Sequence, residues 1–344
     1  MPHLASASKD IGGYLSTAKP CGRTNGVAYY LGIDVGGSKT SCAVGDDVSL
    51  LATVTAGPSN ITRVGEAQAR ESLHQAINRA CSAAKIAPGQ IACACIGVAG
   101  AGRQEIASAI RKIVAEVIAG EIQVVGDMHI ALEAAFGPEP GVIVIAGTGS
   151  IAYGRNAQGK TARAGGWGFA ISDEGSAHWI GRIAVTALLR AIDQRTEPGM
   201  NREEDVQGAA DTSPLFREMS AVWKLHSLDQ FVHTANSNPG FAVLFPAILA
   251  AADVGDALAE SVLARAGAEL SRLARIVVTR LFTEQDASSP AVRLAMVGGV
   301  FRYSPRVRGY FCDEVRKVNH HLDLNPEVVD PVAGALQAAR QGGR

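Results

Sequence analysis

The chain lacks an excess of either charge, because 32 basic residues stand against 33 acidic ones in 344 residues. No charge field therefore favours nucleic acid or an anionic membrane as a partner. No stretch reaches the length of a membrane-spanning helix without a charged residue. Residues 1–26 lack the apolar run of a signal peptide, and we interpret them as a disordered tail. We expect a cytoplasmic protein whose partners are small molecules.

Cysteine pairs with the CxxC spacing are also absent, and no zinc-ligand spacing occurs. Several of the cysteines lie within apolar segments, which predicts buried, reduced thiols. The six are Cys21, Cys42, Cys81, Cys93, Cys95 and Cys312. The sequence does have ample apolar material: 47% of the residues are hydrophobic, and the mean hydropathy is +0.12. This composition is typical of a soluble globular protein, and at this length we expect two domains.

The segment from Tyr30 to Val44 reads YLGIDVGGSKTSCAV, which predicts a strand, a glycine turn and a second strand. Glycines in the turn let the backbone approach an anion, and side chains add donors. The predicted phosphate-binding residues are Gly36, Gly37, Ser38, Lys39 and Thr40. Asp34, at the strand end, would bind Mg²⁺ directly or through water. An ordinary glycine hairpin has the same pattern, and this turn contains no Gly-Lys-Ser/Thr of a Walker A loop.

A second copy of this design runs from Gly141 to Tyr153, GVIVIAGTGSIAY, and predicts two related halves. Its turn adds Gly147, Thr148, Gly149 and Ser150 to the predicted phosphate-binding residues. The same letters fit a dinucleotide fingerprint, with Asp173 as the ribose-binding acid. That fingerprint requires a helix after the turn, whereas residues 151–156 alternate like a strand and lead into a hairpin turn at Ala157 to Lys160. The hairpin interpretation is therefore preferred.

A candidate catalytic base follows the predicted strand from Ile122 to Val125. Asp127 stands at the carboxyl end of this strand, where open α/β sheets bind ligands, and its neighbours are apolar. Asp127 could also cap the helix that follows, and the two roles are compatible. Two further polar residues also allow a purely structural interpretation. Asn60 lies in a predicted loop and can form local turn hydrogen bonds. Glu174 precedes a predicted helix and can interact with the helix dipole.

The most specific segment is Ala164 to Gly181, AGGWGFAISDEGSAHWIG. It resembles the GGWG and DEGSAYWI signatures of N-acetylglucosamine kinases and of the BadF/BadG/BcrA/BcrD ATPase family, within the actin-like sugar kinase superfamily. The resemblance implies that this segment lines a sugar pocket. The substrate-binding residues that it implies are Asn60, Gly100, Asp127, Gly166, Trp167, Asp173 and Glu174. It also implies an adenosine-binding turn at Gly298 and Gly299.

The resemblance implies an α/β, two-domain actin-like ATPase (ribonuclease H-like) fold with nucleotide and sugar in the interdomain cleft. The expected domains are residues 27–137 with a C-terminal helix at 331–344, and residues 138–330. The expected cofactors are ATP and Mg²⁺. We expect an amino sugar substrate, a homodimer, and neither nucleic acid nor membrane as a partner.

The expected activity is ATP-dependent phosphorylation of the 6-hydroxyl of N-acetyl-D-glucosamine, with Asp127 as general base. Glucosamine and N-acetylmuramic acid are alternative substrates. Another alternative is an ATPase activator of a CoA-ester reductase or dehydratase, in which Cys93 and Cys95 would bind an iron-sulfur cluster. Their predicted place on a buried strand argues against this role. A sugar-sensing or structural actin-like protein without turnover is a further alternative, which Asp127 argues against.

Overall fold

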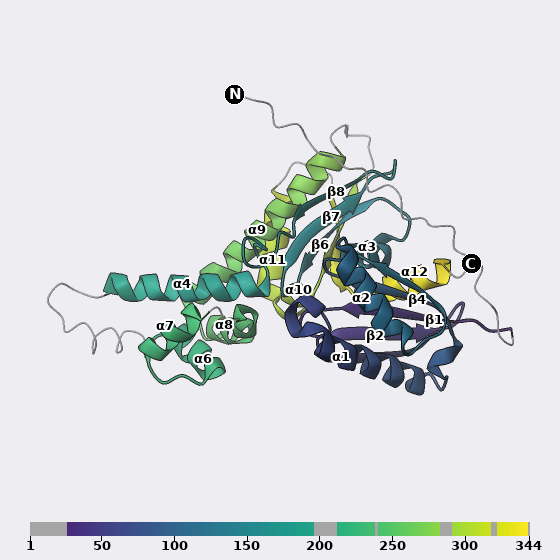
Figure 1. Cartoon of the computed structure of the whole chain (residues 1–344). Coiled ribbons are helices and arrows are strands. Elements are labelled where there is room, and N and C mark those ends of the chain that lie inside the picture. The colour runs from purple at the N-terminus through teal and green to yellow at the C-terminus, as the bar shows by residue number, and fades with distance from the viewer. Residues whose placement is uncertain (1–25, 196–211, 238–239, 283–290, 318–321, 343–344) are drawn as a thin grey trace, which may run out of the picture. The chain divides into compact units, whose positions relative to one another are not determined.

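The structure is a computed structural model that describes residues 26–195, 212–237, 240–282, 291–317 and 322–342 (Figure 1). The predicted tail up to residue 25, including Cys21, lies outside these ranges. The chain divides into two compact units. Unit 1 is Met1–Val125 with Ala335–Arg344, and unit 2 is Gly126–Gly334.

Unit 1 is built on a five-stranded mixed sheet in the order β3-β2-β1-β4-β5. The predicted hairpin is confirmed, because β1 and β2 pair antiparallel. On the other side of β1, the strands β4 and β5 run parallel to it. Apolar and β-branched side chains form these strands. Their bounds are β1 (Tyr29–Val35), β2 (Thr40–Gly45), β3 (Leu50–Ala56), β4 (Ile91–Val98) and β5 (Glu121–Val125).

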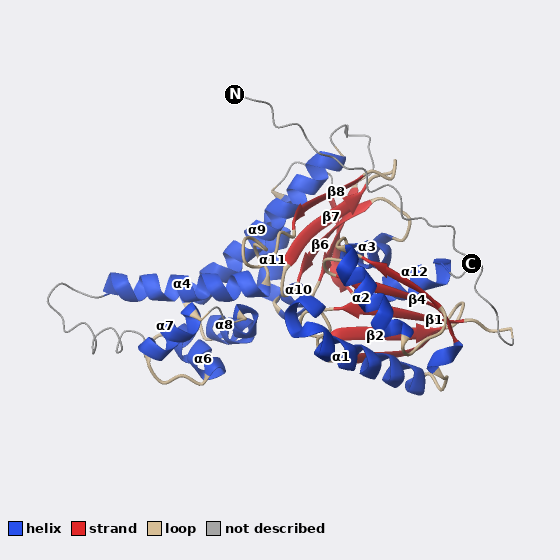
Figure 2. Cartoon of the chain, in the orientation of Figure 1, coloured by secondary structure: helices blue, strands red, loops and turns tan. Residues whose placement is uncertain are grey.

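Helices cover both faces of this sheet (Figure 2). On one face, α1 (Ile61–Ala83) and α2 (Gln104–Ala115) bury side chains such as Leu73 and Ile110 against Leu31 and Ile33. A short 3₁₀ helix, η1 (Pro88–Gln90), precedes β4. On the other face lies α12 (Pro331–Gly342), where the Arg340 guanidinium donates hydrogen bonds to the carbonyls of Asp46 and Ser49.

Unit 2 repeats the topology of unit 1. Its sheet has the order β10-β9-β6-β7-β8, so that β6 to β10 correspond one by one to β1 to β5. Again the first two strands form an antiparallel hairpin, and the parallel strands follow on the other side. The bounds are β6 (Gly141–Ala146), β7 (Ser150–Arg155), β8 (Thr161–Gly165), β9 (Val292–Val297) and β10 (Leu322–Val329). The prediction of two related halves is confirmed. Because β7 is a strand, the dinucleotide alternative is excluded.

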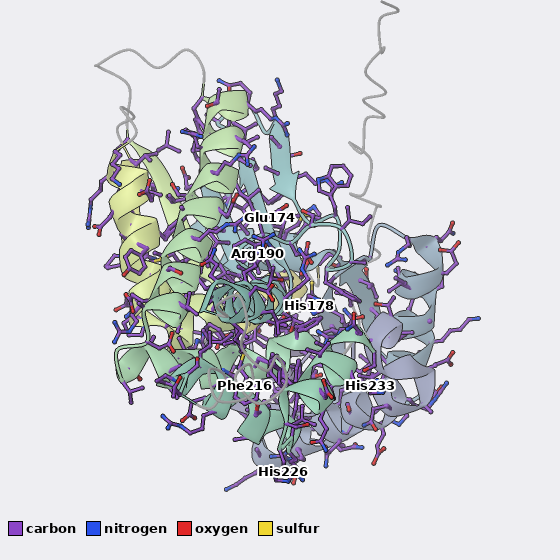
Figure 3. All side chains as sticks on the ribbon, turned by 90° about the vertical axis from the view of Figure 1, so that its left-hand side faces the viewer. Glu174, His178, Arg190, Phe216, His226 and His233 are labelled. Atoms are coloured by element: carbon purple, nitrogen blue, oxygen red, sulfur yellow. The ribbon has the colours of Figure 1, made fainter. Side chains whose placement is uncertain are left out.

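Unit 2 carries a large helical part between β8 and β9. Its longest helix, α9, packs along β6, β7 and β8 and buries Leu270 and Val277 against the sheet. The described helices between β8 and β9 are α4 (Ala177–Arg195), α6 (Pro214–Trp223), α7 (Leu228–Asn236), η2 (Phe241–Leu244), α8 (Phe245–Asp253) and α9 (Ala257–Leu281). Two further helices, α10 (Gly299–Tyr303) and α11 (Pro305–Arg316), lie between β9 and β10. Figure 3 shows His226 and His233 far from Glu174, and both are exposed.

Two helices leave one sheet and cover the other. The helix α3 (Asp127–Phe136) follows β5 of unit 1, yet its residues Ala131 and Leu132 pack on Ile143 and Ala295 of unit 2. In the opposite direction, α12 follows β10 of unit 2, and its residues from Ala335 onward belong to unit 1. The sequence-based boundary at 137/138 assigns α3 to the first domain, and this domain division stays a prediction.

Among the described residues, no single helix has the length and apolar character needed to cross a membrane. One sharply bent pair, the η2 and α8 segment with α9, satisfies these criteria only jointly.

A glycine inside β1 gives a direct test of the packing of α12. A Cβ atom at position 32 would lie 2.3 Å from the Leu336 nitrogen, so that only glycine lets the helix backbone reach the strand. We expect Gly32→Ala to destabilise unit 1 by about 1–3 kcal/mol. Urea unfolding should show a lower midpoint. Gly89→Ala is the matched control, because its Cβ would meet nothing within 4 Å, and an equal midpoint shift in both variants would contradict this explanation.

Candidate functional site

The first glycine turn joins β1 to β2 and presents backbone and side-chain donors at the edge of the unit 1 sheet. Gly36 must be glycine, because a Cβ there would lie 2.4 Å from the Lys39 carbonyl oxygen. Ser38 and Lys39 are exposed, whereas Asp34 is partly exposed at the strand end. Thr40 is fully buried, and its hydroxyl donates to the Gly57 carbonyl at 2.7 Å. The Thr40 side chain is therefore occupied within the protein, and its predicted contact with phosphate stays a prediction.

Asn60 and Gly100 lie at the same edge of the unit 1 sheet, after β3 and β4. Asn60 caps α1, because its Oδ1 accepts hydrogen bonds from the backbone nitrogen and the hydroxyl of Thr62. Asn60 thus has a structural role at the start of α1, and its contact with sugar stays a prediction. Gly100 has a φ of +82°, a conformation that glycine adopts without strain.

The second glycine turn, from Gly147 to Ser150, occupies the corresponding place in unit 2. The Ser150 hydroxyl donates to the Glu174 carbonyl at 2.7 Å, which ties the turn to the loop after β8. Gly298 follows β9 with a φ of +102°, and a Cβ at this position would lie 2.4 Å from the Ala146 carbonyl oxygen. The predicted adenosine turn thus packs on the end of β6, and Gly299 begins α10.

The carboxylate of Asp127 has the properties expected of a functional group. Asp127 is the first residue of α3, and the N-cap of this helix is Gly126. The alternative prediction, that Asp127 is the N-cap, is therefore wrong by one residue. Its Oδ1 accepts a hydrogen bond from the Met128 nitrogen at 3.0 Å. Loss of water raises the pKa of Asp127, although the side chain stays partly exposed. A carboxylate that is poorly solvated and still accessible can accept a proton from a substrate.

Asp173 lies in unit 2 with Asp127 and faces the second glycine turn. Its Oδ1 accepts a hydrogen bond from the Gly168 nitrogen at 3.1 Å, and its Oδ2 lies 2.6 Å from the position that a Cβ of Gly149 would take. Asp173 is buried and has a φ of +61°, which is uncommon for a residue other than glycine. Loss of water raises its pKa, and the charges of Glu174 and Asp127 add to the rise. The charge of Asp127 thus disfavours the ionised form of Asp173.

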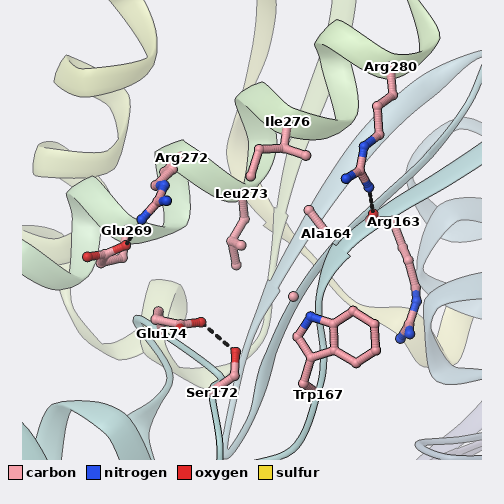
Figure 4. Close-up of a pocket in the computed structure, with 11 residues that line it drawn as sticks. Arg163, Ala164, Trp167, Ser172, Glu174, Glu269, Arg272, Leu273, Ile276 and Arg280 are labelled. Atoms are coloured by element: carbon pink, nitrogen blue, oxygen red, sulfur yellow. Dashed lines mark hydrogen bonds and ion pairs between the residues drawn. The ribbon is translucent and has the colours of Figure 1, made fainter. Parts of the chain in front are cut away.

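Trp167 and Glu174 line a different space from Asp127 and Asp173. They border a pocket of about 420 Å³ between β8 and the second half of α9 (Figure 4). The Glu174 carboxylate accepts a hydrogen bond from the Ser172 hydroxyl at 2.7 Å. Gly166, in the same loop, faces Ile151 instead, because its Cβ would lie 2.7 Å from that side chain. The sugar contacts assigned to Gly166, Trp167 and Glu174 stay predictions.

Sequence reasoning missed the far wall of this pocket. Its residues on α9 include Glu269, Arg272, Ile276 and Arg280, which follow one another at spacings of three or four residues along one helical face. This spacing indicates a shared face, but nothing local to the helix indicates that the face lies over β8.

The positions of the cysteines and of possible metal ligands bear on iron-sulfur and metal binding. Cys42, Cys81, Cys93 and Cys95 are buried, and the described cysteines, with Cys312, form no disulfide. Cys93 and Cys95 lie on β4, between β1 and β5, and are 0% exposed, so an iron-sulfur cluster has no access to them. Within the described ranges, no three His, Cys, Asp or Glu residues gather as a metal site. A single carboxylate such as Asp34 fits Mg²⁺, which phosphate oxygens and water ligate as well.

Two sheets with one topology, each with a glycine hairpin at the edge where ligands bind, define a two-domain actin-like ATPase fold. The sequence pattern of the BadF/BadG/BcrA/BcrD ATPase family matches residues 31–339. The chain belongs to this family, and ATP is the nucleotide that the family uses.

Named relatives and a solved structure agree with this assignment. The chain is 33% identical over 91% of its length to an N-acetylmuramic acid/N-acetylglucosamine kinase of Clostridium acetobutylicum, of which it covers 98%. It is 28% identical to an N-acetyl-D-glucosamine kinase of Dictyostelium discoideum, over 90% of this chain and 97% of that protein. The crystal structure of a protein of Chromobacterium violaceum, described as an N-acetylglucosamine kinase by prediction, superposes with a TM-score of 0.68 at 24% identity, covering 90% of this chain and 98% of that one.

The raised pKa of Asp127 predicts that this residue costs stability. The folded protein binds a proton at Asp127 more tightly than the unfolded chain does, so the ionised form is disfavoured by folding at pH 7. We expect Asp127→Asn to raise the melting temperature at pH 7 by about 2 °C or more. The gain in melting temperature should vanish as the pH falls below about 3.9, the pKa of an aspartate in the unfolded chain.

Melting curves at pH 7 and at low pH test this expectation. Asp229→Asn is the control, because Asp229 is also in the first turn of a helix but is exposed. Equal changes in both variants would show that position in the helix, rather than loss of water, explains the effect.

Proposed function

We propose that this protein is an ATP-dependent kinase that phosphorylates the 6-hydroxyl of N-acetyl-D-glucosamine, with Asp127 as general base. The observation that carries the proposal is the poorly solvated, accessible carboxylate of Asp127 after β5, in a chain 33% identical to an amino sugar kinase. Carboxyl ends of parallel strands are where open α/β sheets bind ligands.

Asp127 would accept the proton of the attacking hydroxyl and orient its oxygen on the γ-phosphorus. The raised pKa favours this role, because a base whose pKa lies closer to the working pH accepts a proton more readily. The bond from the Met128 nitrogen holds one carboxylate oxygen and leaves the other for the sugar. Phosphoryl transition states are loose, so orientation contributes as much as proton removal.

The nucleotide's phosphates would lie on the two glycine turns, one in each unit. Gly36, Gly37, Ser38 and Lys39 supply donors from unit 1, and Gly147, Thr148 and Gly149 supply them from unit 2. Thr40 and Ser150 hold their turns in shape, because both hydroxyls bond to backbone carbonyls. Gly298 and Gly299 would leave room for adenosine. Asp34 would hold Mg²⁺, which supplies charge neutralisation at the phosphates.

The hydroxyls and acetamide of the sugar would bind Asp127, Asp173, Gly166, Asn60 and Gly100. Hydroxyl donors suit Asp173, because the charges of Glu174 and Asp127 disfavour its ionised form, and a donated hydrogen bond would stabilise that form. The name of the Clostridium relative favours N-acetylmuramic acid as a second substrate. Trp167 and Glu174, on the loop after β8, would complete the sugar site.

A panel of sugars at saturating ATP tests the substrate. ADP release should be fastest with N-acetyl-D-glucosamine, slower with glucosamine and glucose, and measurable with N-acetylmuramic acid. Phosphate at O6 can be verified by ³¹P–¹H correlation in the product. Equal turnover of glucose and the N-acetylated sugars would contradict an acetamide-specific site.

Exchange of Asp127 for Asn separates catalysis from binding. Asn keeps the side-chain shape and an acceptor for the Met128 nitrogen but cannot take a proton, so turnover should fall by about 10² to 10⁴ while the sugar Kd stays within threefold. Asp34→Asn should instead weaken use of Mg²⁺-ATP, and added Mg²⁺ should partly restore it. Turnover of Asp127→Asn near the wild-type value at saturating ATP and sugar would refute the assignment of the base.

A further inference from the structure

Two buried hydroxyls, those of Thr40 and Ser59, join the first glycine turn to the loop between β3 and α1. Both side chains are 0% exposed, and their hydroxyl oxygens lie 2.5 Å apart. The Thr40 hydroxyl gives its single proton to the Gly57 carbonyl, which can only accept. Ser59 is therefore the donor in its hydrogen bond with Thr40. The two hydroxyls form a chain of hydrogen bonds that runs from Ser59 through Thr40 to Gly57.

A backbone contact lies beside this pair of hydroxyls. The Ser59 nitrogen donates to the Gly36 carbonyl at 3.4 Å, and the Gly36 nitrogen donates to the Lys39 carbonyl at 3.0 Å, which closes the turn. Neither hydroxyl is exposed to water, so a loop that moved away from the turn would leave a buried hydroxyl without a partner. That loss costs free energy, because no water replaces the missing partner. The turn and the loop are therefore held together as one piece.

The residue next to Ser59 is Asn60, the N-cap of α1. The Asn60 side chain accepts a hydrogen bond from the Thr62 nitrogen, and its carbonyl accepts hydrogen bonds from the nitrogens of Arg63 and Val64. Amide hydrogens held in this way exchange with solvent only when their hydrogen bonds open. The exchange rates of these three amides therefore report how firmly Asn60 is held.

The first turn of α1 is separated from the rest of the helix at Gly65. This residue has a φ of +77° and a ψ of 167°, which are not helical values. Such a conformation is essentially restricted to glycine. A Cβ at this position would meet nothing within 4 Å, so the glycine serves the backbone conformation rather than close packing. Because the helix is interrupted here, the position of Asn60 depends on its other neighbour, Ser59.

We propose that the bond between Thr40 and Ser59 couples the nucleotide to the sugar, with Ser59 as a positioning residue that acts through Asn60. The inference rests on the proposed function, which assigns phosphate to the turn and sugar to Asn60. A phosphate on the turn restricts the motion of the turn and, through Ser59, the motion of Asn60. The sugar then has less motion to remove when it binds, so each ligand raises the affinity for the other.

Every residue of this link belongs to unit 1. The coupling therefore needs no contact between the two units, and it is separable from any closure of one unit on the other. Its signature is an effect of the nucleotide on the first turn of α1 that is present before the sugar binds.

Titration calorimetry with N-acetylglucosamine, with and without a non-hydrolysable ATP analogue and Mg²⁺, measures the coupling. In the wild-type protein, the analogue should raise the affinity for the sugar by about fivefold or more. In Ser59→Ala this gain should fall to about twofold or less, whereas the affinity without nucleotide should stay within about twofold of the wild-type value. A merely structural defect would lower both affinities alike. Thr40→Ser keeps the hydroxyl and should keep the gain.

Hydrogen exchange measures the same link without the sugar. The analogue and Mg²⁺ should slow the exchange of the amides of Thr62, Arg63 and Val64 by about threefold or more in the wild-type protein. In Ser59→Ala the slowing should be largely lost. If this variant does not fold, Thr40→Val replaces it, because valine has nearly the shape of threonine and removes the same hydrogen bond.

Ser72→Ala is the matched control for both measurements. Ser72 is also a buried serine of unit 1, and its hydroxyl accepts a hydrogen bond from the Gln68 side chain. It lies beside Gly57, yet it takes no part in the bond between Thr40 and Ser59. This variant should keep both the gain in sugar affinity and the slowed exchange.

An unchanged gain and unchanged slowing in Ser59→Ala would overturn the proposal, because the coupling would then arise elsewhere. Loss of both effects in Ser72→Ala as well would also overturn it, because destabilisation of unit 1 would explain the loss. A wild-type protein in which the nucleotide slows the exchange through Ser59, but which phosphorylates no amino sugar, would refute the proposed function and leave the link between the turn and Asn60 intact.

Discussion

One hydrogen-bond arrangement holds the ligand-binding edge together in both units. The first residue after each glycine turn carries a hydroxyl, Thr40 or Ser150, that donates to a carbonyl of the loop after the third strand. A carbonyl of each turn also accepts a backbone hydrogen bond: the Gly36 carbonyl from the Ser59 nitrogen of the loop, and the Gly147 carbonyl from the nitrogen of Ala177, the first residue of α4. Because these groups lie at the ends of strands, an unpaired hydroxyl or carbonyl would cost free energy there. The turns are thus shaped by the protein before any phosphate binds.

Much of this architecture could be predicted from the sequence, because the signals are local. Apolar and β-branched runs ended by glycine predicted β1, β2, β6 and β7, and the alternation of residues 151–156 excluded a helix. The sequence does not indicate which sheet a helix covers, so the packing of α3 on unit 2 was missed. Likewise, the sequence does not indicate the positive φ of Asp173, which depends on the surrounding structure.

The loop after β8 illustrates how one short segment can serve two surfaces. Asp173 is held in an uncommon backbone conformation by the Gly168 nitrogen and by the room that Gly149 leaves. Residues in such conformations persist only where the surroundings determine them, and they gather at functional sites. Asp173 therefore lies buried beside Gly149, while its neighbour Glu174 lines the pocket under α9.

The duplicated fold also shows that chemistry depends on surroundings rather than on position. Asp127 follows the fifth strand of one half, and Asp330 follows the fifth strand of the other, each at the start of a helix. Asp330 is exposed and accepts a hydrogen bond from the Val332 nitrogen at 3.4 Å, as acidic residues at the start of a helix commonly do. The Asp127 carboxylate also accepts a hydrogen bond from a nearby backbone nitrogen, that of Met128. Unlike an exposed carboxylate, it is poorly solvated, and this raises its pKa. At Asp127, loss of water disfavours the charged carboxylate, and this property suits a group that takes a proton from a substrate.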